Sequence, residues 1–353
     1  MEKRALEIAR GIGIVSVVLG HIHVPFPAVP PQMYHMALFF FLGGVGISAS
    51  RDWGETGRYL LVRFVWFAFA INAAYFIIAY AIDAVWGVNY LTSKARTLGA
   101  FTTKIVTANG HHVKLALTNW FLVAYCAGYA VAFILVKGMT KLRSGLWVLL
   151  LLGIALCIAG VELGGPKGMP RDWVRNQLSH LTAAGGLMLL GYASVHLGWL
   201  SRITASSKPF FIASFVLVAT WTMLKPGTAI MAWSTYPAGF FGFYAIALSA
   251  ITMIICISAW AVKLPIAQPL AYLGKNSKWI MAHHIAGFAI VNLILVSAGY
   301  LLPEKVSALT FYNTAYLWPA YTLIGFGLPL TLSALWPLLR GRFRRAKVSA
   351  SAA

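Results

Sequence analysis

The segment Arg10-Gly-Ile-Gly-Ile-Val-Ser-Val-Val-Leu-Gly-His21 lies in the first long apolar run of the chain, over residues 8–26. A run of about 20 apolar residues forms a helix that crosses the ~30 Å hydrocarbon layer of a bilayer. Further runs of this kind occupy 33–50, 64–86, 118–136, 145–162, 181–199, 209–224, 236–262, 279–300 and 314–339. The sequence therefore predicts an all-α integral membrane protein, a single bundle of about ten transmembrane helices.

The composition agrees with a membrane protein. Of the 353 residues, 60% are apolar or aromatic and only 10% are charged, and the mean hydropathy is +0.77. Soluble chains carry about 25% charged residues. The net charge of +20 does not indicate nucleic-acid binding, because Lys and Arg lie mostly in short loops between the runs and no nucleic-acid motif is present. We interpret this charge as setting orientation and contacting anionic membrane lipids.

The cysteines give no sign of a metal or redox site. Cys126, Cys157 and Cys256 all lie inside apolar runs and lack the spacing of metal ligands. A thiol at such a depth usually serves as a small packing residue, so we expect no metal. We also expect no cleavable signal peptide, because the first run contains Arg10 and no small-residue cleavage site follows it.

The loops leave no room for a second domain. The longest connections, 87–117 and 163–180, are too short to fold independently. We therefore predict one transmembrane domain over 1–345 and a short disordered cytoplasmic tail over 346–353.

The distribution of basic residues predicts the orientation. If the N-terminus is cytoplasmic, 18 Lys and Arg residues fall on the cytoplasmic side and 9 on the outer side, with Arg10 inside the first helix. Cytoplasmic loops carry the excess of basic residues in membrane proteins. Both termini are therefore expected in the cytoplasm.

Arg10 and His21 form an unusual pair of ionisable residues within one span. Eleven helical positions at about 100° each bring His21 about 20° past three full turns from Arg10, and roughly 16 Å along the axis. Both side chains thus share a face, Arg10 in the cytoplasmic half and His21 in the outer half. Ionisable groups at such depths normally face the bundle interior or an aqueous cavity. The pair suits a substrate that is anionic at its inner end and reacts at its outer end.

Structural roles remain alternatives for both residues. Arg10 could extend to the inner headgroups or pair with Glu7 one turn earlier. His21 could be an interfacial histidine. Their common face favours a functional role.

His35 opens the second run, which follows a proline-rich link over 25–32. Such a link is a tight non-helical turn, so we expect His35 to return near the depth of His21. There it could orient an imidazole or contact a substrate. An interfacial histidine is the alternative.

These residues resemble the acyltransferase-3 family of membrane acyltransferases, in particular its fucose 4-O-acetylase-like branch. The hallmark of the family is an Arg and a His separated by ten residues in the first helix, as Arg10 and His21 are. In the branch, a His-Met-x-Leu-Phe-Phe-Phe run opens the second helix, and the stretch from His35 to Phe41 matches it.

Three later stretches are also similar to family patterns. They are the basic entry to the third helix, from Arg58 to Phe67, the segment Asn119-Trp120-Phe121-Leu122, and Leu273-Gly274-Lys275-Asn276-Ser277 followed by His284. Between them, 137–262 matches in hydropathy only. The Arg-x-x-Arg loop motif of some members is absent, and Arg58 and Arg63 are the nearest substitutes.

The resemblance implies acyl transfer from cytoplasmic acyl-CoA, in the simplest case acetyl-CoA, to a sugar hydroxyl. The acceptor would be an extracellular polysaccharide or its lipid-linked precursor, and the enzyme would lie in the cytoplasmic (inner) membrane. Arginines at the inner mouth would hold the CoA phosphates. The candidate residues are His21, Arg10 and His35 for catalysis, Arg10, Arg58, Arg63, Ser277 and His284 for CoA, and His35 and Trp120 for the acceptor.

Several alternatives stay open. His21 could act as a general base or carry the acyl group covalently. His284 could simply bond to a neighbouring helix, and Trp120 could be an aromatic anchor at the membrane surface. A multi-pass transporter of an anionic or lipid-linked molecule would also use a polar stripe, and a non-catalytic partner in a polysaccharide machine is a third possibility.

The charge distribution gives a topology that reporter fusions can test. Fusions at Ala100 and Gly168 should report the outer side, and a fusion at Gly138 should report the cytoplasm. A cytoplasmic signal at Ala100 would overturn the predicted orientation.

Overall fold

A computed structural model describes most of the chain. It covers 2–22, 24, 29–91, 99, 113–139, 142, 144–166, 173–225 and 227–351, with side chains up to residue 337. The proline-rich link 25–32 and the connections 87–117 and 163–180 lie partly outside these residues. The predicted tail over 346–353 lies beyond the last described side chain, so that domain boundary stays a prediction.

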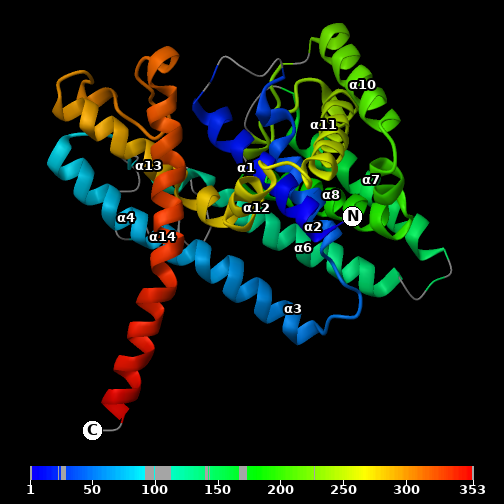
Figure 1. Cartoon of the computed structure of the whole chain (residues 1–353), viewed down its shortest axis with the longest axis horizontal. Helices are drawn as coiled ribbons and strands as arrows, with labels where there is room; N and C mark the ends of the chain where they lie inside the picture. Colours follow the sequence, from blue (N-terminus) through cyan, green and yellow to red (C-terminus); the bar gives the residue numbers. More distant parts are fainter. Residues whose placement is uncertain are drawn as a thin grey trace. The chain divides into compact units, whose positions relative to one another are not determined.

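The chain forms two compact units (Figure 1). The first comprises Met1–Gly20, Phe26–Ala70 and Asn119–Lys275, and the second His21–Pro25, Ile71–Thr118 and Asn276–Ala353. Every extended element among the described residues is helical, apart from isolated β-bridges at Leu91–Val113 and Ile230–Thr235. The all-α class is confirmed, whereas the single bundle stays a prediction.

The first unit contains most of the helices. They are α1 (Lys3–Ile22, up to Gly20), α2 (His35–Val45), α3 (Trp53–Leu60), α6 (Trp120–Met139), α7 (Gly145–Gly164), α8 (Trp173–His196), α9 (Trp199–Thr204), α10 (Lys208–Leu224), α11 (Gly239–Ala261) and α12 (Ala267–Lys275). Short turns join them at η1 (Pro31–Met33), the π-helical η2 (Leu61–Val65) and η5 (Met231–Trp233).

The second unit takes the end of α1 and most of α4 (Trp66–Trp86). Its other elements are η4 (Lys114–Asn119, up to Thr118), α13 (Ser277–Ser297), η6 (Pro303–Lys305) and α14 (Thr314–Ser351).

The described helices make this a multi-pass membrane protein. Seven helical stretches are long and apolar enough to cross a bilayer: Lys3–Ile22, Trp53–Trp86, Lys114–Met139, Gly145–Gly164, Trp173–His196, Gly239–Ala261 and Ser277–Ser297. The other predicted spans fall on α2, α10 and α14, which are not among the seven. Helix α2 has 11 residues and α10 has 17. The count of ten and the cytoplasmic termini stay predictions.

Three predicted helix starts are wrong for the same reason. Helix α1 begins at Lys3, the third span begins with α3 at Trp53, and α8 begins at Trp173. The added turns contain charged, polar and glycine residues, so a search for apolar runs misses them. Asp52 caps α3 by accepting the N–H groups of Gly54 (2.6 Å) and Glu55 (3.3 Å), and these bonds lower the pKa of its exposed carboxyl.

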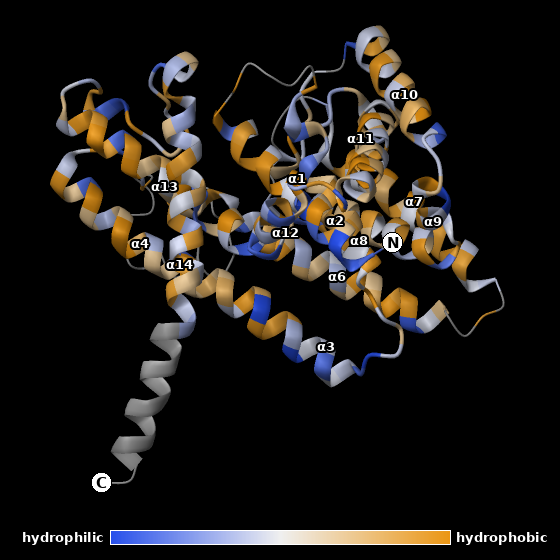
Figure 2. Ribbon diagram, viewed as in Figure 1, coloured by the Kyte–Doolittle hydropathy of each residue, from blue (hydrophilic) through white to orange (hydrophobic). Residues whose placement is uncertain are grey.

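Exposed apolar side chains line the outer surfaces of several helices. On α7, Trp147 is 57% exposed and Leu151 is 65% exposed. Figure 2 shows hydrophobic colouring along α7 and α10. Because a soluble protein buries such side chains, this surface fits contact with lipid.

Small residues let α2 and α8 pack closely in the first unit. A Cβ atom added to Gly44 would lie 1.8 Å from the Met188 carbonyl oxygen, and one added to Gly191 would lie 2.0 Å from the Phe41 carbonyl oxygen. Only glycine fits at either position without moving a backbone. In a membrane, where apolar burial adds little between helices, such close packing supplies much of the association energy.

Gly44→Ala should therefore destabilise the first unit. Overpacking of this kind costs about 1–3 kcal/mol, so the thermal unfolding midpoint of the purified protein in detergent should fall. Gly138→Ala is the matched control, because no atom lies within 4 Å of its added Cβ. That variant should be neutral or up to ~1 kcal/mol more stable, since alanine favours helix. Equal midpoints for the two variants would contradict the packing argument.

Candidate functional site

The second unit brings His21 and His284 together. His21 lies one residue before the end of α1, and His284 is fully buried on α13. Their ring centroids are 5.0 Å apart, with the planes at 58°. The structure thus places His284 beside the predicted catalytic histidine, and its predicted contact with CoA stays a prediction.

The His284 ring is held in one orientation. Its Nδ1 lies 2.8 Å from the Ile280 carbonyl oxygen and 3.1 Å from that of Met281. Because a carbonyl oxygen only accepts, Nδ1 carries the proton and Nε2 keeps a lone pair in the neutral ring. Thr118 donates its hydroxyl to the Met281 carbonyl at 2.7 Å, which ties this turn to the neighbouring segment.

The neighbouring His283 belongs to a different cluster. One residue along a helix turns the side chain by about 100°. The Nδ1 atom of His283 lies 2.5 Å from the Tyr75 hydroxyl, and its ring stacks on Trp279 at 5.3 Å. Within the second unit, His284 thus contacts His21, while His283 packs toward α4.

A cluster of arginines and tyrosines occupies the first unit. The guanidinium groups of Arg51 and Arg63 lie 5.4 Å and 5.8 Å from the ring centroid of Tyr59. The Tyr59 ring contacts Tyr129 at 6.1 Å, and Tyr125 stacks on Tyr129 at 6.3 Å. We call these five residues the arginine–tyrosine cluster.

Helix geometry explains how the cluster forms. On α6, Tyr125 and Tyr129 are four residues apart and therefore share a face. Arg63 and Phe64 lie in the π-helical turn η2, and Phe64 stacks on Tyr125 at 4.8 Å. Such π-helical insertions often occur at functional sites.

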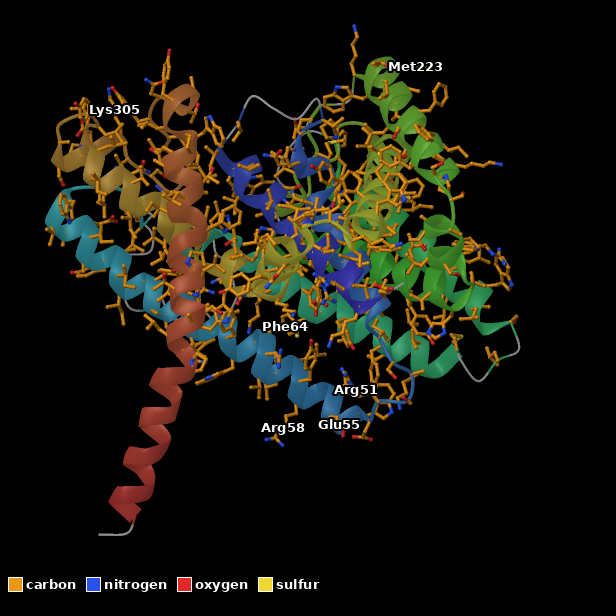
Figure 3. The ribbon with its side chains drawn as sticks, in the orientation of Figure 1. Arg51, Glu55, Arg58, Phe64, Met223 and Lys305 are labelled. Atoms are coloured by element: carbon orange, nitrogen blue, oxygen red, sulfur yellow. The ribbon has the colours of Figure 1, made fainter. Side chains whose placement is uncertain are left out.

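The predicted arginines separate into two groups. The charge of Arg10 acts on the Tyr125 hydroxyl, which places Arg10 near the cluster. Arg58 is exposed, and Figure 3 shows its side chain on the opposite side of the helix from Phe64. Figure 3 also shows Arg51 directed to the same side as Phe64. Arg51 was not among the residues expected to bind CoA, because the sequence shows only a basic residue directly before Asp52.

The Gly-Lys-Asn-Ser stretch forms a structural joint. A Cβ atom on Gly274 would lie 1.9 Å from the Glu7 carbonyl oxygen, so glycine lets α12 touch α1. The Lys275 ammonium group pairs with the Glu7 carboxylate at 3.5 Å. Glu7 thus pairs with Lys275, instead of the Arg10 partner that we considered.

The same stretch also starts α13. Asn276 precedes the helix and accepts a hydrogen bond from Ser333 at 2.6 Å, and Ser277 is the first helical residue. Asn276 and Ser277 thus mark where α13 begins, seven residues before His284. A direct contact of Ser277 with CoA stays a prediction.

His35 and Trp120 are both buried in the first unit. The Nδ1 atom of His35 lies 2.6 Å from the Pro31 carbonyl oxygen and must donate to it, which leaves Nε2 as an acceptor. Trp120 is only 7% exposed, and its ring lies 4.7 Å from the His180 ring. Their contacts with a glycan, and the depth of His35 relative to His21, stay predictions.

The described residues include no group of three or more His, Cys, Asp or Glu side chains that could hold a metal ion. The three cysteines are free thiols. An imidazole such as that of His21 or His284 can transfer a proton or attack as a nucleophile.

Comparison with known proteins identifies the family. The family model of the acyltransferase domain, acyltransferase-3, matches residues 3–336. Neither a search of curated proteins nor a search of solved structures gave a significant match. The family match includes α1 with Arg10 and His21, the arginine–tyrosine cluster and His284. Because it covers nearly the whole chain, the protein belongs to the acyltransferase-3 family.

Proposed function

We propose that this protein transfers an acyl group from cytoplasmic acyl-CoA to a sugar hydroxyl of an extracellular polysaccharide or its lipid-linked precursor. Acetyl-CoA is the simplest donor. We expect the protein to belong to the fucose 4-O-acetylase-like branch of the family and to lie in the inner membrane. The observation that carries this proposal is the contact between His21 and His284. This contact places the imidazole of His284 beside that of His21, the histidine of the family's Arg-and-His helix. Membership in an acyltransferase family favours this function over transport.

The arginine–tyrosine cluster is our candidate for the CoA end of the site. Guanidinium groups form paired hydrogen bonds to phosphate, and tyrosine rings present flat faces on which an adenine can stack. Arg51 and Arg63 meet at Tyr59, and Arg10 lies near Tyr125. The predicted orientation places α3 at the cytoplasmic side, where CoA is found.

The proposed reaction is a direct transfer. The oxygen of the sugar hydroxyl attacks the thioester carbonyl carbon while a neutral His21 ring takes the hydroxyl proton. A C–O bond forms, the C–S bond breaks, and the proton passes on to the leaving thiolate to give free CoA. His284, fixed by its backbone bonds, positions the His21 ring. An acyl-histidine route would differ by leaving the acyl group on the protein before the acceptor is added.

His21→Gln tests the proposed base. Glutamine keeps a hydrogen-bonding group but cannot accept the proton, so transfer should fall by ~10²–10⁴-fold. Acyl-CoA affinity should stay within about twofold of wild type. Mass spectrometry of surface glycans should show one acyl mass fewer in cells that carry this variant, as in cells that lack the protein.

His196→Gln is the control, because His196 is exposed on α8 and packs on Tyr192 at 4.2 Å. It should leave acylation unchanged. If His21→Gln keeps more than about a tenth of the wild-type rate, His21 only positions substrate.

Arg51→Ala and Arg10→Ala should each weaken acyl-CoA binding. A hydrogen bond to a charged group contributes ~1.5–3 kcal/mol, so the dissociation constant should rise about 10- to 100-fold. Arg58→Ala removes the same charge from the exposed side of α3 and should change affinity less than about threefold. Equal losses for Arg51→Ala and Arg58→Ala would mean that net charge, and not the cluster, attracts the donor. Calorimetric titration with acyl-CoA measures all three.

A further inference from the structure

A buried group of neutral polar side chains lies where several connections of the first unit meet. It contains Asn119 and Trp120 at the start of α6 and His180 in the second turn of α8. Beside His180 lies the turn from Ile230 to Thr235 between α10 and α11. The charge bias predicts the outer side for all of these helix ends. We call Asn119, Trp120 and His180 the outer polar cluster.

His180 presents an acceptor atom to the interior. Its side chain is 1% exposed, and its Nε2 lies 2.8 Å from the Met231 carbonyl oxygen. That carbonyl only accepts, so Nε2 carries the proton and Nδ1 has a lone pair. Among the described residues, Nδ1 is buried and has no hydrogen-bond partner. The Trp120 ring lies against the His180 ring at 4.7 Å and limits its rotation.

Asn119 presents both a donor and an acceptor. The residue is 1% exposed, and neither atom of its side-chain amide finds a hydrogen-bond partner in the described part of the chain. A buried polar group without a partner destabilises a fold, and such groups in native proteins call for a specific explanation.

The surroundings of the cluster are well bonded. Ser234 donates to the Asn176 side-chain oxygen at 2.5 Å, and Ser179 donates to the Gly160 carbonyl at 2.6 Å. Ser234 also has a φ of +47°, an unfavourable value for serine that the turn retains. The Tyr236 hydroxyl, which follows the same turn, is also buried and has no hydrogen-bond partner among the described residues.

The geometry points to the outer polar cluster as the subsite for the acceptor sugar. A sugar hydroxyl both donates and accepts. It therefore matches the lone pair of His180 and the amide of Asn119, which offers one group of each kind. The cluster is neutral, so it suits a neutral sugar better than an anion. Trp120, whose contact with the glycan stays a prediction, packs against the His180 ring. This inference rests on the proposed glycan acceptor and adds the residues that bind it.

Asn119→Leu separates a binding role from a structural one. Leucine has a similar volume and removes the unpartnered amide, so the variant should unfold at a higher temperature than wild type. It should also lower the acylated fraction of surface glycans about tenfold or more, while acyl-CoA affinity changes less than about twofold. A merely structural asparagine would not give a more stable and less active protein.

Asn176→Leu is the matched control in the same unit. Its side-chain oxygen is already bonded to Ser234, so this substitution should lower the unfolding temperature. His180→Gln tests the second residue. The glutamine amide can still donate near the position of Nε2 but offers no acceptor at the position of Nδ1, so glycan acylation should again fall about tenfold or more.

Binding can be tested without acyl transfer. A panel of methyl glycosides of the common neutral hexoses, added to the purified wild-type protein, should raise its unfolding temperature. The shift should disappear in Asn119→Leu and His180→Gln. Glycoside binding would raise the unfolding temperature even if the acyl donor were not CoA. A failure of this binding test can therefore be told apart from a failure of the proposed function.

Two results would overturn the inference. One is the absence of protection by every glycoside, and the other is full glycan acylation by Asn119→Leu. A lower unfolding temperature for Asn119→Leu would show that buried water satisfies the amide, and would overturn it as well.

Discussion

Ionisable and polar side chains inside an apolar bundle must be paired or bonded, because an unpartnered polar group at that depth costs several kcal/mol. This constraint explains the form of the histidine pair. His284 is fully buried, and the backbone carbonyls of Ile280 and Met281 hold its proton on Nδ1. The ring is thereby fixed before any substrate arrives, so the adjoining His21 meets a neighbour of defined orientation.

Close contacts at glycine also determine how helices pack in the first unit. Gly274 lets α12 approach α1, and the Lys275–Glu7 pair adds a charge contact beside it. Helix α13 begins two residues later, at Ser277. A side chain at Gly274 would push α12 away from α1 in the first unit. Gly274 and Lys275 of the family stretch thus have a packing role in the first unit, and the contact of Ser277 with CoA stays a prediction.

Sequence patterns predicted the helical class, seven of the ten apolar spans and the Arg10–His21 helix, because each depends on local periodicity or on residues of one helix. They did not predict that His284 lies beside His21, since 263 positions separate the two residues and no pattern encodes that contact. Arg51 was missed and Arg58 favoured for a related reason. Both are cations near one helix, and only the packing of α3 decides which one faces Tyr59 and Tyr129. The contact of Trp120 with His180 was not predicted either, because the two residues lie on different helices, and the role of Trp120 at the glycan stays a prediction.

The ten-residue gap between Arg10 and His21 has a simple meaning once α1 is known to be continuous from Lys3 to Ile22. A continuous helix sets a fixed separation of roughly 16 Å between the two residues along its axis. In the proposed reaction Arg10 lies near the phosphates of CoA and His21 near its thioester, at the two ends of the pantetheine arm. A helix is stiffer than a loop, so it can hold these two anchors at a constant spacing while the acyl arm moves. Deleting or adding one residue between them would rotate His21 by about 100° away from Arg10, which is why the spacing matters more than the apolar residues that fill it.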